Sequence, residues 1–172
     1  MTAPLAHERL RDARSSDDWI TPRAILGALG RFDLDPCASD AQPWPTADRM
    51  NAARENNGLA IPWTGRVWLN PPYKAVGEWL RRLAIHGNGV ALVFARVETD
   101  WWWRWVWERA TSVLFVRGRL RFCLPSGGRG PGRGIGPSAL VAYGQPNGDC
   151  LATCGIEGAF TSTWTGRRLT RG

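Results

Sequence analysis

The stretch RVWLNPPYKAVGEWLRRLAIHGNGVALVFA, residues 66–95, contains three successive patterns. Residues 66–69 are typical of a strand that two prolines end, and residues 74–86 have the periodicity of an amphipathic helix. The apolar face of this helix consists of Val76, Trp79, Leu80 and Leu83. A Gly-Asn-Gly triplet ends the helix, and the apolar run 90–95 is typical of a strand buried on both faces. This succession predicts an α/β fold built on a parallel sheet.

The residues upstream of this unit extend the alternation of helices and strands. We predict a helix over residues 23–29, with Thr21 as its N-cap, the following proline as its first residue and a glycine at its end. Residues 32–35 alternate in polarity before a proline, which predicts a short strand that ends there. Residues 39–62 are rich in Ala, Pro, Asn and Asp, and we predict that they are mostly loop.

The downstream residues add further strands and an unusual helix. Residues 100–110 predict a tryptophan-dense helix with rings on more than one face, which favours packing over contact with a partner. The other expected elements are strands over 112–116, 119–124 and 138–143, a Gly/Arg-rich loop over 126–136 and a hairpin around 159–164. Backbone N–H groups and guanidiniums suit phosphates, so we expect the Gly/Arg loop to contact a nucleic-acid backbone, with a plain connector as the alternative.

Together these elements predict a largely parallel sheet with flanking helices. We expect one domain over residues 17–172, preceded by a flexible polar lead over residues 1–16. Ligands of such sheets bind at the carboxyl ends of the strands. Residues 35–36 and residues 70–73 both lie at predicted carboxyl ends, so we expect them to share one cleft.

The composition fits a globular protein without a membrane span. The chain has 172 residues, of which 44% are hydrophobic, and it contains no apolar run of about 18 residues. Its polar N-terminus lacks the apolar region of a signal peptide. The four cysteines form no CxxC pair: Cys37, Cys123, Cys150 and Cys154. We therefore expect reduced, partly buried thiols in a cytoplasmic protein, and no metal site.

The charge of the chain is positive and unevenly distributed. The formal net charge is +7, and Lys74 is the only lysine. No acid lies between Glu108 and Asp149. The arginines of this interval and of the C-terminal tail are Arg109, Arg117, Arg119, Arg121, Arg129, Arg133, Arg167, Arg168 and Arg171. A field of one sign on half of a small protein predicts a polyanionic partner, with a basic but inert surface as the alternative.

The tetrapeptide Asn70-Pro71-Pro72-Tyr73 carries the clearest chemistry. Two prolines fix φ and donate no N–H, so the loop is stiff. Asn70 Oδ1 and the Pro71 carbonyl can accept both hydrogens of an aromatic amine, which frees the nitrogen lone pair for attack on a methyl group. Tyr73 offers a flat face to a base flipped out of a duplex. The alternative is a simple strand-ending turn.

The segments on either side of this tetrapeptide complete an ordered set of motifs. They are Trp19-x-Thr21-Pro22, Asp33-Leu34-Asp35-Pro36-Cys37-Ala38-Ser39, Asn57-Gly58-Leu59, Trp63-x-Gly65-x-Val67-Trp68-x-Asn70-Pro71-Pro72-Tyr73, Ala95-Arg96-x-x-Thr99-Asp100-x-Trp102, Gly118-Arg119-Leu120-Arg121-Phe122 and Pro137-Ser138-Ala139-Leu140. The set resembles the phage-type DNA N-6-adenine methyltransferases (the Dam-like family). The resemblance implies a Rossmann-like methyltransferase sheet with flanking helices and S-adenosylmethionine as the cofactor.

The resemblance also implies roles for individual residues. Those expected to bind S-adenosylmethionine are Trp19, Thr21, Pro22, Asp35, Pro36, Cys37 and Ala38. The expected catalytic residues are Asn70, Pro71, Pro72 and Tyr73. Those expected at the target base and the DNA are Tyr73, Phe122, Arg119 and Arg121, joined by Arg129 and Arg133 of the Gly/Arg loop. Ser39-Asp40 stands where many methyltransferases have Gly-x-Gly, and Asn57 stands where such families often have an acid.

The sequence therefore predicts an S-adenosylmethionine-dependent enzyme that methylates adenine N6 in DNA. The alternatives are methyl transfer to another amino or amide nitrogen (RNA guanine, cytosine N4 or protein glutamine) and an inactive nucleic-acid-binding protein. The short chain favours a short or loosely read target, bound through salt-sensitive phosphate contacts. The family association implies a phage or prophage origin and action in the bacterial cytoplasm. Target sequence, oligomeric state and any pairing with a restriction nuclease are left open.

Overall fold

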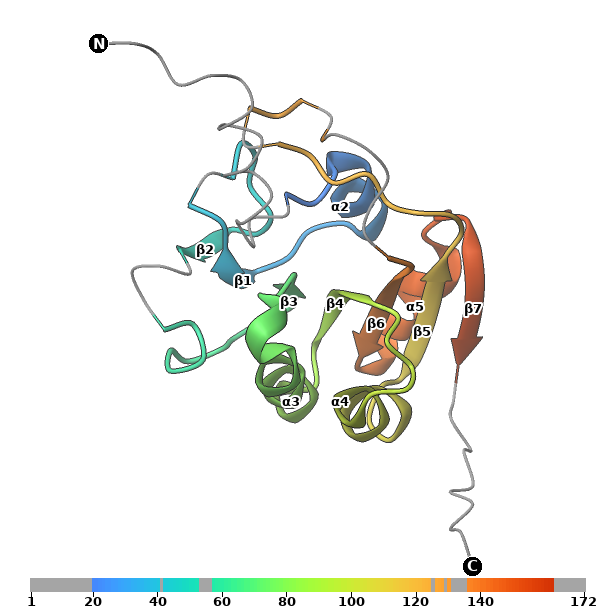
Figure 1. The fold of residues 1–172 in the computed structure, drawn as a ribbon. Helices are drawn as coiled ribbons and strands as arrows, with labels where there is room; N and C mark the ends of the chain where they lie inside the picture. Colours follow the sequence, from blue (N-terminus) through green and yellow to red (C-terminus); the bar gives the residue numbers. More distant parts are fainter. Residues whose placement is uncertain are drawn as a thin grey trace, which may run out of the picture.

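A seven-stranded sheet forms the centre of the computed structural model, which describes residues 20–40, 42–52, 57–124, 126–128, 130 and 136–162 (Figure 1). The elements in chain order are α2 (Arg23–Leu29), β1 (Leu34–Ala38), β2 (Arg49–Ala52), β3 (Val67–Leu69), the 3-10 turn η1 (Tyr73–Ala75), α3 (Val76–His86), β4 (Gly89–Phe94), α4 (Asp100–Trp102), the π-helical η2 (Trp103–Trp107), β5 (Ser112–Val116), β6 (Ser138–Tyr143), α5 (Gln145–Thr153) and β7 (Gly158–Ser162).

The sheet has two halves that differ in strand direction. The strand order is β2-β1-β3-β4-β6-β5-β7. The strands β2, β1, β3 and β4 pair in parallel and form the parallel half. The strands β6, β5 and β7 form the antiparallel half, which joins β4 through an antiparallel β4–β6 pair. The prediction of a largely parallel sheet is therefore wrong for the second half. In the described part of the β5–β6 connection there is no helix, and parallel neighbours usually need a helical crossover.

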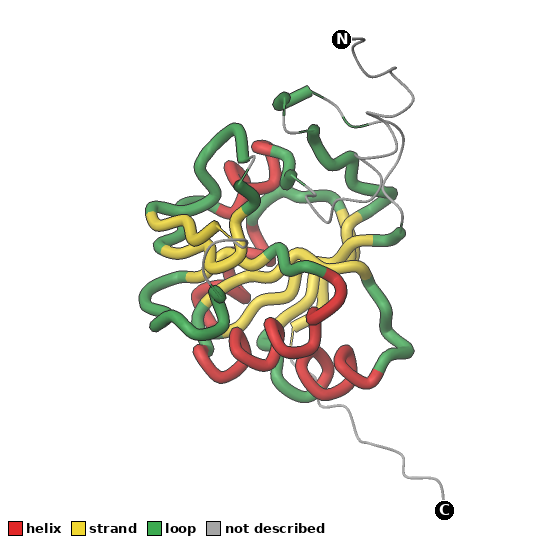
Figure 2. Tube along the Cα trace, turned by 60° about the vertical axis from the view of Figure 1, so that its left-hand side comes forward, coloured by secondary structure: helices red, strands yellow, loops and turns green. Residues whose placement is uncertain are grey.

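Helices cover both faces of this sheet (Figure 2). Successive side chains of a strand point to opposite faces. On β4, Ala91 and Val93 pack in one core cluster with α3 and the α4–η2 segment. Leu92 and Phe94 pack in a second cluster with α2 and α5. Both β4 and β6 are buried along their whole length, which confirms the prediction for the apolar run of β4.

The central strand–helix–strand unit is also confirmed. The buried residues of α3 are the four that were expected: Val76, Trp79, Leu80 and Leu83. Gly87 ends this helix in a left-handed conformation, with φ of 73°, and its N–H donates to the Leu83 carbonyl. The bounds of α2 match the prediction, but Thr21 is not its N-cap. Pro22 occupies that position with φ of −59° and ψ of 137°, and no side chain caps the helix.

Two predictions upstream of β3 are wrong. The first strand does not end at Pro36 but runs through it to Ala38, because an irregular register between Asp35 and Ala38 accommodates the residue without an N–H. Residues 39–62 are not all loop, since β2 lies within them and pairs with β1 at the sheet edge. An edge strand with exposed side chains has no apolar alternation to reveal it.

The downstream predictions hold in part. The strands β5 and β6 are confirmed, and the tryptophan-dense helix is real but ends at Trp107. Residues 119–124 are not a strand, and their described pairing is one bridge between Cys123 and Ile20. Instead, β7 occupies the place beside β5, and α5 fills a stretch that had no clear pattern. The expected hairpin around 159–164 is wrong in its described part, which is the single strand β7.

Two further predictions concern the N-terminal lead and a membrane span. The lead over residues 1–16 lies outside the described residues. No helix in the described ranges is long and apolar enough to cross a membrane.

Candidate active site

The predicted site residues lie at the carboxyl ends of neighbouring strands in the parallel half. Asn70 follows β3 directly. Because side chains alternate along a strand, Asn70 lies on the same side of the sheet as Trp68, two residues earlier. That side also carries Leu92 and Phe94, near the end of the neighbouring β4. The loop after β3 therefore opens toward side chains from β4.

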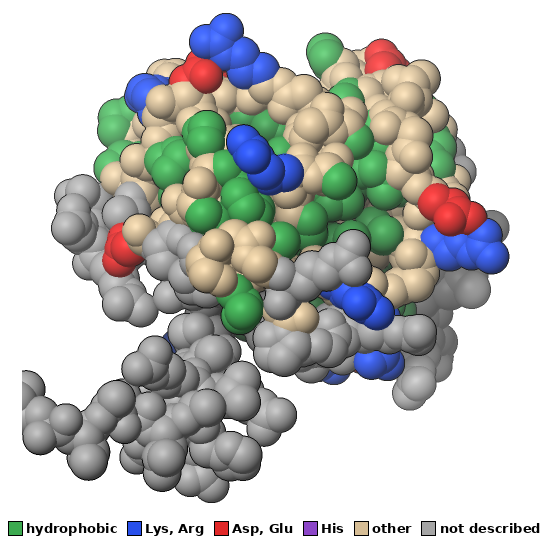
Figure 3. Space-filling view, turned by 90° about the horizontal axis from the view of Figure 1, so that it is seen from above, with side chains coloured by type: hydrophobic (Ala, Val, Ile, Leu, Met, Phe, Trp, Pro, Cys, Tyr) green, Lys and Arg blue, Asp and Glu red, His purple; other side chains and the backbone are tan. Residues whose placement is uncertain are grey.

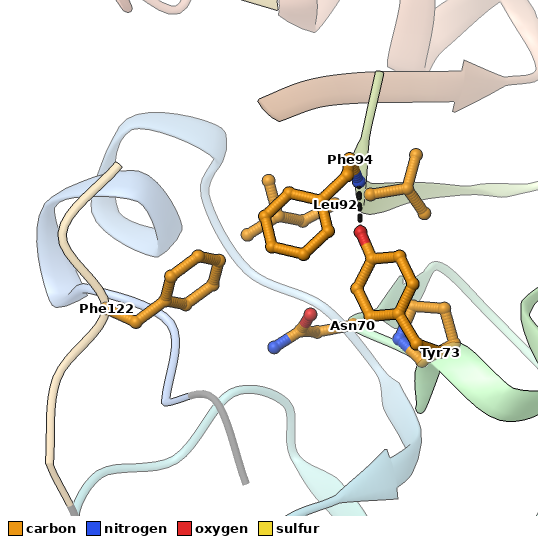
Figure 4. Close-up of a pocket in the computed structure, with 7 residues that line it drawn as sticks. Asn70, Tyr73, Leu92, Phe94 and Phe122 are labelled. Carbon is orange, nitrogen blue, oxygen red and sulfur yellow. Dashed lines mark hydrogen bonds between the residues drawn. The ribbon is translucent and has the colours of Figure 1, made fainter. Parts of the chain in front are cut away.

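Asn70 contacts both segments that were expected to bind the cofactor. Its Nδ2 donates to Thr21 Oγ1 at 3.3 Å, and its backbone carbonyl accepts from Cys37 Sγ at 3.4 Å. Figure 4 shows the carboxamide oxygen on the side of Phe94 and the nitrogen turned away from it. The Thr-Pro segment, the end of β1 and the Asn-Pro-Pro-Tyr loop thus meet at one place.

Three aromatic rings stand beside the Asn70 carboxamide (Figure 4). Tyr73 stacks on Phe94 with ring centroids 4.5 Å apart, and Phe122 meets Phe94 edge-on at 6.4 Å. The Phe94 backbone N–H donates to the Tyr73 hydroxyl oxygen at 2.5 Å. One face of Tyr73 is therefore covered by Phe94, a residue that the sequence prediction missed. Its signal in the sequence was an aromatic residue at the end of a buried strand.

These side chains enclose a small pocket. It is lined by Asn70, Pro71, Tyr73, Leu92, Val93, Phe94 and Phe122. The space between them is about 10 Å³, room for about one water molecule. A purine base does not fit there unless side chains move.

A larger open hollow adjoins this pocket. Its volume is about 300 Å³, and it is lined by Phe94, Ala95, Arg96, Glu98, Gly136 and Pro137. Phe94 is the one residue common to both linings. Phe94 therefore borders both the pocket beside Asn70 and a space large enough for a base.

Asp35 lies inside β1 rather than in a turn after it. It is 3% exposed. Its Oδ1 accepts from the Cys37 N–H at 3.0 Å, and its Oδ2 accepts from Thr46 Oγ1 at 2.5 Å. Burial raises the pKa of Asp35 to about 6, although the hydrogen bonds from Thr46 and Cys37 work against that rise. The carboxylate therefore holds the end of β1 in place.

The Cys37 thiol and the Tyr73 hydroxyl beside Asn70 are neutral at physiological pH. Burial raises the pKa of the Cys37 thiol well above its ordinary value, and the nearby Asp35 adds to the rise. Burial likewise raises the pKa of Tyr73. A neutral hydroxyl and a neutral carboxamide suit the binding of an uncharged aromatic amine.

The Asn57-Gly58-Leu59 segment forms a tight turn against the end of β1. Asn57 Oδ1 accepts from the Leu59 N–H at 3.1 Å, so its side chain shapes the turn. A Cβ on Gly58 would lie 1.8 Å from the Pro36 carbonyl oxygen. Glycine is therefore required here by the close approach of two backbone segments.

The basic residues predicted at the DNA are exposed where the structure describes them. Arg119 and Arg121 lie on the irregular segment that carries Phe122. Arg117, in the stretch that lacks acids, forms an exposed ion pair with Glu157. Seen from above, the described part of the molecule shows basic and acidic side chains scattered among many apolar ones (Figure 3). The residues Trp19, Arg129 and Arg133 lie outside the described residues.

The segment after β1 contains a donor that fits a bound cofactor. Gln42 Nε2 is buried and has no hydrogen-bond partner among the described residues. Its backbone N–H donates to the Ser39 carbonyl, so it belongs to the turn that follows β1. A buried donor without a partner is costly unless a ligand satisfies it. The methionine carboxylate and the adenine ring of S-adenosylmethionine both offer suitable acceptors. The Gln42 side chain therefore fits that cofactor. No motif or pattern in the sequence pointed to Gln42.

Within the described ranges, no three His, Cys, Asp or Glu side chains are grouped so that they could hold a metal ion.

Residues 9–142 match the family model described as DNA N-6-adenine-methyltransferase (Dam). Comparisons with curated proteins and with solved structures give no significant match. The matched range includes every element from α2 to β5 and most of β6, and with them all of the residues placed above around Asn70.

Proposed function

Because this chain belongs to the DNA N-6-adenine-methyltransferase (Dam) family, we propose that it transfers a methyl group from S-adenosylmethionine to the N6 amine of adenine in DNA. The observation that carries the proposal is the placement of Asn70. Its carboxamide stands at the end of β3, within hydrogen-bond distance of Thr21 and beside three aromatic rings. The site thus combines a neutral acceptor with flat apolar walls.

Asn70 and Pro71 would bind the target amine. Asn70 Oδ1 and the Pro71 carbonyl accept its two hydrogens, which draws electron density back onto the nitrogen lone pair. The prolines hold the loop backbone and the Pro71 carbonyl still, so little backbone reorganisation is needed. The amine loses a proton only after it has gained the methyl group, so no strong base is required at the site.

The cofactor would lie between the Thr-Pro segment and the end of β1. The residues proposed to hold it are Trp19, Thr21, Pro22, Asp35, Pro36, Cys37 and Ala38, and Gln42 joins them. Asp35 acts through the shape of this segment, because both of its oxygens already accept hydrogen bonds. When bound, S-adenosylmethionine would supply a methyl group on a positively charged sulfur, whose carbon the amine lone pair could attack as the carbon–sulfur bond breaks.

The target base would enter beside Asn70 after the aromatic side chains rearrange. A flipped adenine needs far more room than the pocket of about 10 Å³. Displacement of the Phe94 ring would join the pocket to the adjoining hollow. Tyr73 and Phe122 would then face the base. Arg119, Arg121, Arg129 and Arg133 would contact DNA phosphates, which makes affinity salt-dependent. The bacterial cytoplasm of a phage host is the proposed place of action.

The proposal is tested by transfer of a labelled methyl group from S-adenosylmethionine to unmethylated duplex DNA, followed by nucleoside analysis. We expect N6-methyladenine from the wild type. We expect Asn70→Ala to lower the rate by at least about a hundredfold, because it removes one positioned acceptor. Its melting temperature should stay within a few degrees of the wild type, since Asn70 is only half-buried.

Other results of this assay would indicate other functions. N4-methylcytosine would keep the reaction class and change the base. Cofactor binding without any methylated nucleoside would contradict the DNA assignment, and the same assay with RNA and with protein would then test the guanine and glutamine alternatives. Absence of cofactor binding would contradict the enzyme assignment as a whole.

A further inference from the structure

Ser138 begins β6 with a buried hydroxyl that has no partner. The residue is 2% exposed, and its Oγ makes no hydrogen bond to any described residue. Leaving a hydroxyl buried and unpaired costs free energy, and such groups are rare in folded proteins. A ligand that completes the missing bond is one physical reason for a protein to keep such a group.

The pairing of β4 with β6 places this hydroxyl on the side of the sheet that carries the Asn70 pocket. Ser138 lies directly opposite Phe94 in the antiparallel register. Residues that lie opposite each other project from the same face of a sheet. On this face Phe94 packs in one core cluster with Phe122, which also lines the pocket. The Ser138 side chain is therefore a direct neighbour of the Phe94 side chain.

Ser138 also adjoins the open hollow. The two residues before it, Gly136 and Pro137, line this hollow together with Phe94. A Cβ on Gly136 would lie 3.6 Å from Phe94 Cδ1, so the ring packs against this segment. Entry of a base requires the Phe94 ring to move, and that movement would uncover the Ser138 hydroxyl at the edge of the enlarged pocket.

Ser112 shows that an unpaired hydroxyl is not sufficient to mark a binding site. It is fully buried, and its Oγ also has no partner among the described residues. It lies opposite Ala142, which is about 13 Å along β6 from Ser138. A Cβ on Gly148 would lie 3.4 Å from its Oγ, so α5 covers it. Ser138 differs because a residue that lines the pocket stands beside it.

We propose that the Ser138 hydroxyl donates a hydrogen bond to a ring nitrogen of the flipped adenine. The ring nitrogens N1, N3 and N7 accept hydrogen bonds, and a serine hydroxyl supplies one hydrogen. In the proposed function the N6 amine donates to Asn70 and to the Pro71 carbonyl, so Ser138 contacts a different part of the base. The inference rests on the proposed function and adds a base-binding residue from the antiparallel half of the sheet.

The first test compares Ser138→Ala with Ser112→Ala, which removes the other unpaired serine hydroxyl. Single-turnover methyl transfer to DNA is measured at saturating S-adenosylmethionine. We expect Ser138→Ala to be about tenfold slower than the wild type, because the bond to the base is lost. Ser112→Ala should stay within about twofold of the wild type. A wild-type rate in Ser138→Ala, or equal losses in the two variants, would overturn the proposal.

A second test removes the acceptor from the base instead of the donor from the protein. The methylated adenine is first mapped in DNA treated with the wild type, and short duplexes then carry 1-deaza-, 3-deaza- or 7-deazaadenine at that position. Each analogue keeps the N6 amine and replaces one ring nitrogen by C–H. We expect one analogue to slow the wild type about tenfold more than it slows Ser138→Ala, because the variant has no bond left to lose. Equal relative losses in both proteins for all three analogues would show that Ser138 contacts no ring nitrogen.

A third test needs no substrate. Ser138→Ala should unfold at a urea concentration equal to or higher than that of the wild type, because the hydroxyl that it removes has no partner. A lower midpoint would mean that the hydroxyl is bonded within the free protein, and it would overturn the proposal. If the wild type methylates no DNA, the proposed function fails. If the wild type methylates DNA and Ser138→Ala does so at the same rate, this inference fails alone.

Discussion

The parallel and antiparallel halves of the sheet share both core clusters but differ in what lies at their edges. In the parallel half, β1 and β3 end at the same edge, and the segments that follow them meet around Asn70. In the antiparallel half, successive strands end at opposite edges, so the segments that follow them are separated. Parallel direction therefore brings residues distant in sequence to one site.

The two halves also differ in the charge of their buried polar side chains. Asp35 is the one buried carboxylate among the described residues, and it lies in the parallel half. The buried polar residues of the antiparallel half and its helix are neutral: Ser112, Ser138 and Asn147. The half that carries the site thus accepts a desolvation cost that the other half avoids.

The largest expected difference between the halves comes from two crowded glycines. An added Cβ would lie 1.8 Å from the Pro36 carbonyl oxygen at Gly58, and 2.2 Å from the Phe115 carbonyl oxygen at Gly158. We expect Gly58→Ala to cost about 3 kcal/mol of stability and to weaken S-adenosylmethionine binding about tenfold, because the end of β1 must move. Chemical denaturation and calorimetric titration of the cofactor measure the two effects.

Gly158→Ala is the matched control. It lies on the edge strand β7, which can shift outward, so we expect a cost of about 1 kcal/mol and unchanged cofactor affinity. Gly27→Ala provides a second reference, since nothing lies within 4 Å of the added atom. Equal cofactor affinity in Gly58→Ala and Gly158→Ala would contradict the view that the parallel half alone shapes the cofactor site.

A smaller effect is expected at Phe122, which belongs to the β5–β6 connection but lies at the site. Phe122→Leu should slow methyl transfer about fivefold and leave cofactor affinity unchanged, because it removes aromatic stacking on the base. Phe115→Leu, on β5, also removes aromatic contacts, with Trp102 and Trp107. We expect a stability loss of about 1 kcal/mol from each and a rate effect only from Phe122. Equal methyl-transfer rates in Phe122→Leu and Phe115→Leu would restrict the site to the parallel half.

The sequence was sufficient to predict the part of this site that depends on short-range patterns. The apolar face of α3, the buried run of β4 and the stiff loop at Asn70 each follow from periodicity or from proline. The ordered motifs supplied the family. What could not be predicted depends on contacts between distant segments. Phe94 lines the pocket because β4 lies beside β3, and an aromatic residue at the end of a buried strand does not by itself indicate that.

Two further errors have the same physical origin. Proline normally ends a strand, but β1 continues through Pro36 because its register with β2 is irregular at that point. Residues 119–124 have the composition of a strand, but β7 takes the place beside β5. In both cases the pairing between strands, and not the local sequence, determined which residues form a strand. The weak pattern of α5 was missed because Leu151 is its one large apolar residue that is fully buried.

A further expected effect depends on pH and concerns the buried carboxylate that distinguishes the parallel half. Burial raises the pKa of Asp35 to about 6 in the folded chain, from an ordinary value of 3.8. The folded state therefore binds this proton more tightly than the unfolded state, and the contribution of Asp35 to the free energy of unfolding decreases as pH rises from about 4 to 6. Asp35→Asn removes that dependence. We expect its stability relative to the wild type to increase by about 2 kcal/mol between pH 4 and pH 7, measured by urea denaturation.

Asp48→Asn is the control of opposite sign for this pH dependence. Asp48 is exposed, and its ion pair with Arg31 lowers the pKa of its carboxyl group. The folded state therefore releases this proton more readily, so Asp48 contributes stability above the unfolded pKa that is lost as pH falls. Removing it should destabilise the chain slightly at pH 7 and not at low pH, which is the reverse of Asp35→Asn. If Asp35→Asn tracked the wild type at every pH, the carboxylate would not be desolvated, and the two halves would not differ in the cost of their buried polar groups.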